Sequence, residues 1–142
     1  MKADRLSAVK VDVLELLRAQ QYGLAFDKVL SSSDSDLLAW TCTKVRADEL
    51  FSVSPLPLGQ GVVLSLAQQL GCDLHRDTAT KVAWIREAAL SLDASDPALR
   101  PHIHHVLSGL EEIVERVIDG SEGALKTELR LCSRVLRTVL RK

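Results

Sequence analysis

The residues best suited to chemistry in this chain are its four histidines and three cysteines. Cys72 and His75 are one helical turn apart, and so are His102 and His105. A structural zinc site needs four converging ligands, and the sequence lacks the closely spaced cysteine pairs that usually supply them. Cys42 is a candidate nucleophile only beside a base, and no local signature supplies one. We therefore expect packed thiols, no metal, no cofactor and no enzymatic activity.

The stretch from residue 92 to residue 106 has the chemistry of a junction between two helices. Asp96 can accept a hydrogen bond from the open amides of a new helix, and Pro97 fits a first turn, where its missing N–H costs nothing. Pro101 would remove a helical hydrogen bond if the same helix continued. The pattern predicts a short turn over 97–100 and a new helix that begins near Pro101.

Length and composition indicate a single all-α domain. The chain has 142 residues, of which 46% are apolar and only 4% aromatic, and no run of alternating β-branched residues exceeds a few positions. The formal charge of -1 and the pI near 6.4 give no global attraction to nucleic acid or to membranes. Any such attraction must therefore be local.

Cysteine use and hydropathy indicate the compartment. Three widely spaced cysteines within helical patterns favour free thiols in a reducing compartment, the cytoplasm or the nucleus. No apolar stretch approaches the roughly 20 residues of a membrane span, and residues 1–10 lack the apolar core of a signal peptide. We expect a soluble protein without a membrane partner.

Apolar residues recur at helical spacing along most of the chain. The spacing, with a weak break at Gly23 and an extended connection at Pro55 and Pro57, predicts helices over 4–20, 25–30, 37–45, 47–51, 60–74, 77–91, 101–120 and 125–140. Apolar residues on two sides of the helix that ends near 91, Leu90 among them, predict neighbours on both sides. Seven or eight helices with short links favour antiparallel pairs stacked as a short α-solenoid, with a closed bundle as the alternative.

Three segments carry a family resemblance: 20–45, with Phe26 and Trp40; 55–74, with Leu64-Ser65-Leu66; and 81–106, with Leu92-Asp93, Ser95-Asp96-Pro97, Arg100 and His102. The third is the most specific. On these residues the chain resembles the C-terminal domain of the enhancers of mRNA decapping, a family of large scaffolds that includes the plant Varicose proteins.

The resemblance implies an armadillo-like or HEAT-like α/α fold without catalysis. It also implies a role in assembling decapping factors and in reaching cytoplasmic processing bodies. Family members carry a WD40 propeller and a coiled-coil linker before this domain, and the chain contains neither. Residues 1–142 are thus expected to be one helical domain, the C-terminal domain of a larger scaffold.

The candidate partner-binding residues lie along the helix that ends near residue 91 and at the junction after it: Lys81, Trp84, Glu87, Asp93, Arg100 and His102. Tryptophan is common at interface hot spots, although the flank of an apolar arc, where Trp84 lies, favours a partly buried packing residue over a binding anchor. His102 beside Arg100 suits an acidic peptide, or else a corner held by bonds to Asp93 or Asp96. A link from Asp93 to Arg100 would be local.

The last two predicted helices carry opposite charges on their outer faces. One has Glu111, Glu112, Glu115 and Asp119, and the other has a basic strip of Lys126, Arg130, Arg134, Arg137 and Arg141. A solvated surface with weak rim ion pairs accounts for this pattern. So does a strip that docks an acidic segment or an RNA backbone. The lack of nearby aromatic residues argues against sequence-specific recognition of single strands.

With the resemblance, these features predict a non-catalytic interaction domain of an mRNA-decapping scaffold. Its expected partners are the decapping enzyme, its activators or the 5′-to-3′ exonuclease, bound through linear segments on a helical surface. Direct RNA binding through the basic strip is one alternative, and self-association is another.

Overall fold

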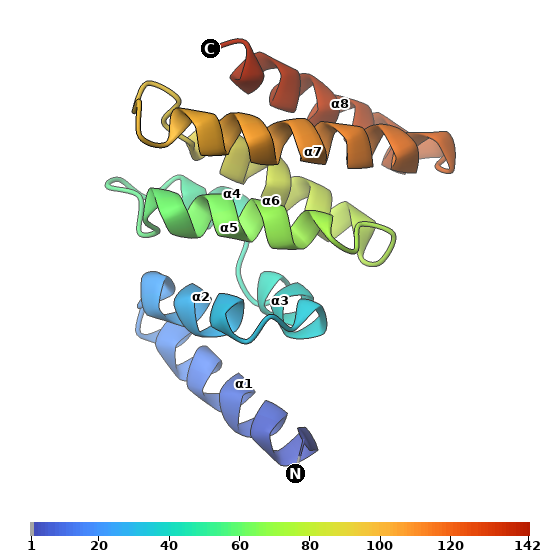
Figure 1. The fold of residues 1–142 in the computed structure, drawn as a ribbon. Coiled ribbons are helices and arrows are strands. Elements are labelled where there is room, and N and C mark those ends of the chain that lie inside the picture. The colour runs from blue at the N-terminus through green and yellow to red at the C-terminus, as the bar shows by residue number, and fades with distance from the viewer. Residues whose placement is uncertain (1) are drawn as a thin grey trace.

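The computed structural model describes residues 2–142 of the chain. Within this range the chain forms eight α-helices and no strands (Figure 1). The helices are α1 (Lys2–Arg18), α2 (Tyr22–Ser31), α3 (Ser35–Cys42), α4 (Ala47–Phe51), α5 (Gln60–Gly71), α6 (Thr78–Ser91), α7 (Arg100–Asp119) and α8 (Gly123–Leu140). The prediction of an all-α fold is confirmed.

The helices are arranged in chain order from one end of the molecule to the other. α1 lies at the N-terminal end, α5 and α6 lie in the middle, and α7 and α8 lie at the C-terminal end (Figure 1). α1 packs on α2 and α3, α5 packs on α6, and α8 packs on both α6 and α7. The short helix α4 packs on α6.

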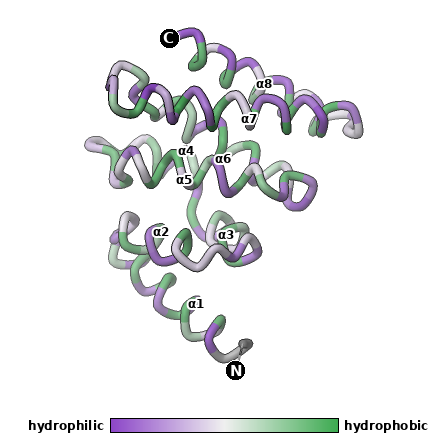
Figure 2. The backbone as a smooth tube through the Cα atoms, in the orientation of Figure 1, coloured by the Kyte–Doolittle hydropathy of each residue, from purple (hydrophilic) through white to green (hydrophobic). Residues whose placement is uncertain are grey.

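One continuous core runs through the molecule. Phe26, Leu66, Ile85, Leu107 and Leu136, from five different helices, are all completely buried. Hydrophobic and hydrophilic positions alternate along α7 and α8, as the period of an amphipathic helix requires (Figure 2). Burial of this apolar stripe is the main force that holds each helix to the next.

The first helix break differs from the predicted one. Gly23 lies inside α2, and the chain turns instead at Gln20, which has a positive φ of 60°. The amide of Gln21 donates to the carbonyl of Leu16 over 2.8 Å and so closes the end of α1. A glycine was the obvious candidate for this turn, but a glutamine adopts it because the closing bond is available.

α5 ends at Gly71, earlier than the predicted residue 74. A Cβ at Gly71 would collide with the side chain of Leu110 on α7, so the glycine permits close approach of these two helices. Leu74 lies beyond the helix but is only 1% exposed, which explains why it fits the apolar pattern. Similarly, α3 ends at Cys42, and Val45 belongs to the connection to α4.

α6 has neighbours on more than one side, because it packs on α3, α4, α5 and α8. The prediction of neighbours on both sides of α6 was based in part on Leu90, and this part was wrong. Leu90 is 54% exposed and contributes little to this packing, whereas Trp84 is buried.

The junction between α6 and α7 follows the predicted pattern. α6 ends at Ser91, and α7 begins at Arg100 with Pro101 in its first turn. The carboxylate of Asp96 accepts a hydrogen bond from the amide of Ala98 at 2.9 Å. Sequence reasoning missed Gln60, whose side chain donates to the carbonyl of Ser91 and accepts from an amide in the junction.

All three cysteines are free thiols, as predicted. Cys42 and Cys132 are packed in the core, but Cys72 is exposed, which corrects the expectation that all three are packed. In residues 2–142 no helix has the length and apolarity needed to cross a bilayer.

Candidate functional site

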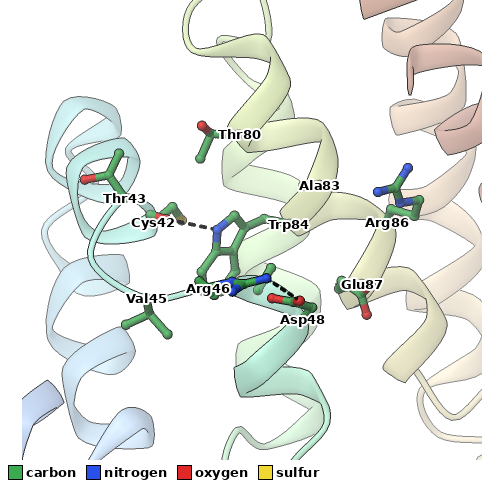
Figure 3. Close-up of a pocket in the computed structure, with 11 residues that line it drawn as sticks. Cys42, Thr43, Val45, Arg46, Asp48, Thr80, Ala83, Trp84, Arg86 and Glu87 are labelled. Atoms are coloured by element: carbon green, nitrogen blue, oxygen red, sulfur yellow. Dashed lines mark hydrogen bonds and ion pairs between the residues drawn. The ribbon is translucent and has the colours of Figure 1, made fainter. Parts of the chain in front are cut away.

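A groove of about 550 Å³ lies between the connection from α3 to α4 on one side and α6 on the other. We call it the α4–α6 groove. It is lined by Cys42, Thr43, Val45, Arg46, Ala47, Asp48, Thr80, Ala83, Trp84, Arg86 and Glu87 (Figure 3). It thus contains two of the predicted partner-binding residues, Trp84 and Glu87.

Trp84 forms the floor of this groove rather than an open contact. It is only 2% exposed, and its ring packs against Phe26 at 5.5 Å and Phe51 at 5.8 Å between centroids. Its indole N–H donates to the carbonyl of Cys42 at 3.1 Å (Figure 3). This carbonyl belongs to the last turn of α3, where helical partners run out. Trp84 is therefore a packing residue that ties α6 to α3.

Lys81 is also unavailable to a partner. It is 3% exposed, and its ammonium group donates to the carbonyl of Asp73 at 2.6 Å. The expected contact surface along α6 is therefore corrected at Lys81, whereas the burial of Trp84 fits the packing interpretation of that residue. Both positions are covered because α6 is enclosed by several helices, which a single-helix pattern does not reveal.

The rim of the groove carries charges that largely neutralise each other. Arg46 contacts Asp48 at 3.0 Å, and Arg86 contacts Glu128 of α8 at 2.9 Å. Glu87 is half-buried and forms no ion pair among the described residues. The groove thus combines an apolar floor with a polar rim, which is the composition of many peptide and ligand sites.

The junction residues do not form the predicted cluster. Asp93 accepts a hydrogen bond from the amide of Ser95 at 3.1 Å, and bonds from Ser95 lower the pKa of this carboxyl. Arg100 donates to the carbonyl of Lys142 at 3.2 Å. His102 is exposed. Within residues 2–142 no hydrogen bond joins Asp93 to Arg100 or His102, so the expected local link is absent and these side chains face solvent.

The basic strip is partly paired with the acidic face of α7. Arg137 contacts Glu111 at 2.6 Å and Glu115 at 3.0 Å, and these contacts raise its pKa. Ser133 donates to Glu115 at 2.7 Å. Rim ion pairs are thus present, as one of the two interpretations predicted. The remaining strip residues form no ion pair with the side chains of residues 5–142: Lys126, Arg130, Arg134 and Arg141.

The thiols of Cys42 and Cys132 are buried and have raised pKa values. Burial raises the pKa of Cys42 to about 12, although Lys81 opposes this effect slightly, and burial also raises the pKa of Cys132 to about 12. A protonated, buried thiol is a poor nucleophile and a poor metal ligand. Among the side chains that the structure describes, those of residues 5–142, no three of histidine, cysteine, aspartate or glutamate converge in a possible metal site.

A family model described as Enhancer of mRNA-decapping protein 4, C-terminal, matches residues 13–131. The chain belongs to this family. Enhancer of mRNA-decapping protein 4 from Homo sapiens is 35% identical over 105 residues, which cover 74% of this chain and 8% of that protein. The homolog from Drosophila melanogaster is 30% identical over 109 residues, which cover 77% of this chain and 8% of that protein.

The fold agrees with this family membership. The crystal structure of the conserved C-terminal region of Ge-1 matches with a TM-score of 0.80 and 28% identity, covering 92% of this chain and 98% of that one. The resemblance stated from the sequence is therefore confirmed. The chain corresponds to a small part of the curated enhancers of mRNA decapping, about a twelfth of their length.

Proposed function

We propose that this domain is a non-catalytic interaction module of a cytoplasmic mRNA-decapping scaffold. It binds linear segments of the decapping enzyme, its activators or the 5′-to-3′ exonuclease, and it helps the scaffold to reach processing bodies. Several copies of such a scaffold raise the effective concentration of decapping factors near a transcript. Family membership is the single observation that carries this proposal.

The α4–α6 groove is the proposed binding surface for these segments. Its volume of about 550 Å³ accommodates a few side chains of an extended peptide, and its floor at Trp84 is rigid. Ala83 lies half-buried in its wall, and its small side chain leaves the groove open at this point. A partner's apolar side chain would fill this space, and Thr80 and Glu87 would bond to its backbone.

The stacked order of the helices supports a solenoid interpretation as well. We infer that the eight helices form a short α-solenoid of the armadillo or HEAT type, in which successive pairs contribute to one extended surface. Superposing the α5–α6 pair on the α7–α8 pair tests this inference. A regular solenoid requires similar crossing angles and a constant rotation between pairs.

The function is tested by co-precipitation of purified decapping and 5′-to-3′ exonuclease proteins with the domain, with and without nuclease. An Ala83→Arg variant places a long side chain in the groove, and a Leu90→Arg variant adds the same charge on α6 outside it. We expect nuclease-resistant capture that Ala83→Arg reduces by about tenfold and Leu90→Arg leaves intact. Equal capture by both variants would refute the α4–α6 groove as the binding site. The absence of any capture by the unaltered domain would refute the proposed function.

The predicted junction site gives a separate arm of this experiment. Arg100 and His102 are both exposed, so a double alanine variant is expected to remain folded. If this variant alone loses capture, the partner binds at the junction and not in the groove.

RNA binding is the second candidate, and the unpaired part of the basic strip favours it. Arg130 and Arg134 are exposed one turn apart on α8 and form no ion pair among the described residues. Charge reversal of both would abolish RNA binding and leave peptide capture unchanged. Capture that disappears with nuclease, together with a steep loss at high salt, would favour this candidate. Self-association would instead appear as a mass that rises with concentration in light scattering.

A further inference from the structure

A second groove, of about 380 Å³, lies on the other side of the connection between α3 and α4. We call it the α1–α4 groove, because α1, the start of α2 and this connection enclose it. Its apolar wall is formed by Leu14 and Leu17 of α1, Tyr22 of α2, and Val45. All four side chains are half-buried, so apolar surface remains open to an incoming side chain.

The charges around this groove are unbalanced. Arg46 and Glu49 both line it and contact each other at 3.7 Å, and Arg46 also contacts Asp48 at 3.0 Å, so the charge of this arginine is offset by nearby carboxylates. Arg18 and Lys44 line it too, and neither forms an ion pair within the described part of the chain. A net positive rim therefore surrounds an apolar wall, in a chain whose overall charge is -1.

A half-buried tryptophan beside the groove extends this positive region. The ammonium group of Lys44 lies 5.4 Å from the ring centroid of Trp40, and that of Lys10 lies 5.1 Å from the same centroid. The two ammonium nitrogens are thus no farther apart than the sum of these distances. The ring attracts each cation, but it supplies no negative charge that would neutralise both. A carboxylate near either ammonium group would therefore be attracted to this region.

The basic strip on α8 offers no comparable site. One of its members, Arg137, is already bound to Glu111 and Glu115, so an acidic ligand at this position would compete with two carboxylates of the protein itself. The hollow beside it also lacks an apolar wall of similar extent, since Ile118 is its one aliphatic lining residue.

We propose that the α1–α4 groove binds an acidic linear segment with apolar anchors. An apolar side chain of the segment inserts against Leu14, Leu17 and Val45, and flanking carboxylates bind Arg18 and Lys44. The apolar wall favours a peptide over RNA, because phosphates would neutralise the rim but leave this wall exposed to water. This inference rests on the proposed function in assuming that the domain binds linear segments, and it places a second such site away from Trp84.

The test uses a labelled synthetic peptide with two leucines one helical turn apart among glutamates. Fluorescence anisotropy measures its binding to the domain, and the matched control peptide has serines in place of the leucines. We expect the leucine peptide to bind at least about tenfold more tightly than the serine peptide, since two apolar anchors are lost. Binding is also expected to weaken as salt increases. Equal binding of the two peptides would overturn the proposal.

Two charge-reversal variants locate the site. Arg18→Glu with Lys44→Glu reverses the rim of the α1–α4 groove, and Arg130→Glu with Arg134→Glu makes the same change in net charge on α8. The first variant is expected to lose binding by about a hundredfold, and the second to change it less than about threefold. Equal loss in both variants would show attraction to net charge only and would overturn the proposal. Circular dichroism melts confirm that both variants are folded.

Trp40 provides a signal that a merely structural role would not give. A bound acidic segment draws Lys10 and Lys44 away from the ring, so the emission of Trp40 changes with peptide concentration, whereas buried Trp84 does not respond. We expect this change in the parent domain and in the Arg130→Glu with Arg134→Glu variant only. A labelled oligouridylate that binds at Arg18 and Lys44 while the peptide does not would overturn the proposal in favour of RNA.

The two grooves can fail independently. The Ala83→Arg variant is expected to bind the acidic peptide normally, because Ala83 does not line the α1–α4 groove. If the peptide binds but no decapping or exonuclease protein is captured, the proposed function fails and the acidic-segment site stands. If capture succeeds and the peptide does not bind, the reverse is true.

Discussion

Replacing Trp84 with phenylalanine tests whether this residue is a packing residue or a contact residue. The indole N–H of Trp84 donates a hydrogen bond to the carbonyl of Cys42, and Trp84 is only 2% exposed. Leaving a buried carbonyl without a partner costs about 1–3 kcal/mol. The smaller ring leaves a gap of roughly 40 Å³, which adds about 1 kcal/mol at about 24 cal/mol per Å³. The free energy of unfolding of Trp84→Phe should therefore fall by about 2–4 kcal/mol.

Thermal and urea unfolding followed by circular dichroism measure this loss. For a domain of this size, it corresponds to a melting temperature lower by about 6–15 °C. Trp40→Phe is the matched control, because Trp40 is half-buried and its indole N–H has no described hydrogen bond. We expect the control to lose about 1 kcal/mol or less. Equal losses in the two variants would refute the role assigned to the bond with Cys42.

The same variant separates folding from binding. If Trp84 only packs, protein capture by Trp84→Phe falls no further than the folded fraction does at the assay temperature. A loss of capture while the domain remains folded would show that the indole itself contacts the partner.

Three further predictions concern helix packing and the burial of the thiols. Gly71→Ala should destabilise the domain by about 1–3 kcal/mol in urea unfolding, because the new Cβ would collide with a side chain of α7. Gly109→Ala should instead stabilise the domain by about 0.5–1 kcal/mol, because a Cβ at this position meets no atom within 4 Å. A thiol reagent at neutral pH should label only Cys72 in the folded domain and all three cysteines after unfolding, and mass spectrometry measures the labelling. Rapid labelling of a second cysteine in the folded domain would contradict the burial of Cys42 and Cys132. The pKa of Cys42 and of Cys132 rises from 9.0 to about 12 in the folded domain, so the stability contributed by the neutral thiols is complete below pH 9.0 and is lost as the pH rises toward 12. The free energy of unfolding, measured across this pH range, should therefore fall less steeply when both cysteines are replaced by alanine.

The sequence predicted those features that depend on local chemistry. The bounds of α6 and the start of α7 were close, because residues such as Asp96 and Pro101 determine a helix junction without help from distant segments. The opposite charges on α7 and α8 were also evident, and the pairs formed by Arg137 follow from the antiparallel packing of these two helices.

Features that depend on distant residues were not predictable in the same way. Trp84 has the same local pattern whether the adjacent surface is solvent or α2 and α4, and only the fold places Phe26 and Phe51 against its ring. The side chain of Gln60 forms hydrogen bonds with Ser91 and Asp93, which lie 31 and 33 positions further along the chain. A glutamine at the start of a helix gives no sign of such a partner, so no sequence pattern could have identified it.

The position of the connection between α3 and α4 unites the two proposed sites. Val45 and Arg46 line both grooves, so this single segment is the wall that separates them. A partner whose linear segment crosses this wall would place an apolar residue in each groove and its carboxylates over Arg18 and Lys44. Binding at the second groove would then be intramolecular, and the combined affinity would exceed that of either half without any new contact. Such a partner would bind more tightly than a segment that reaches only one of the two grooves.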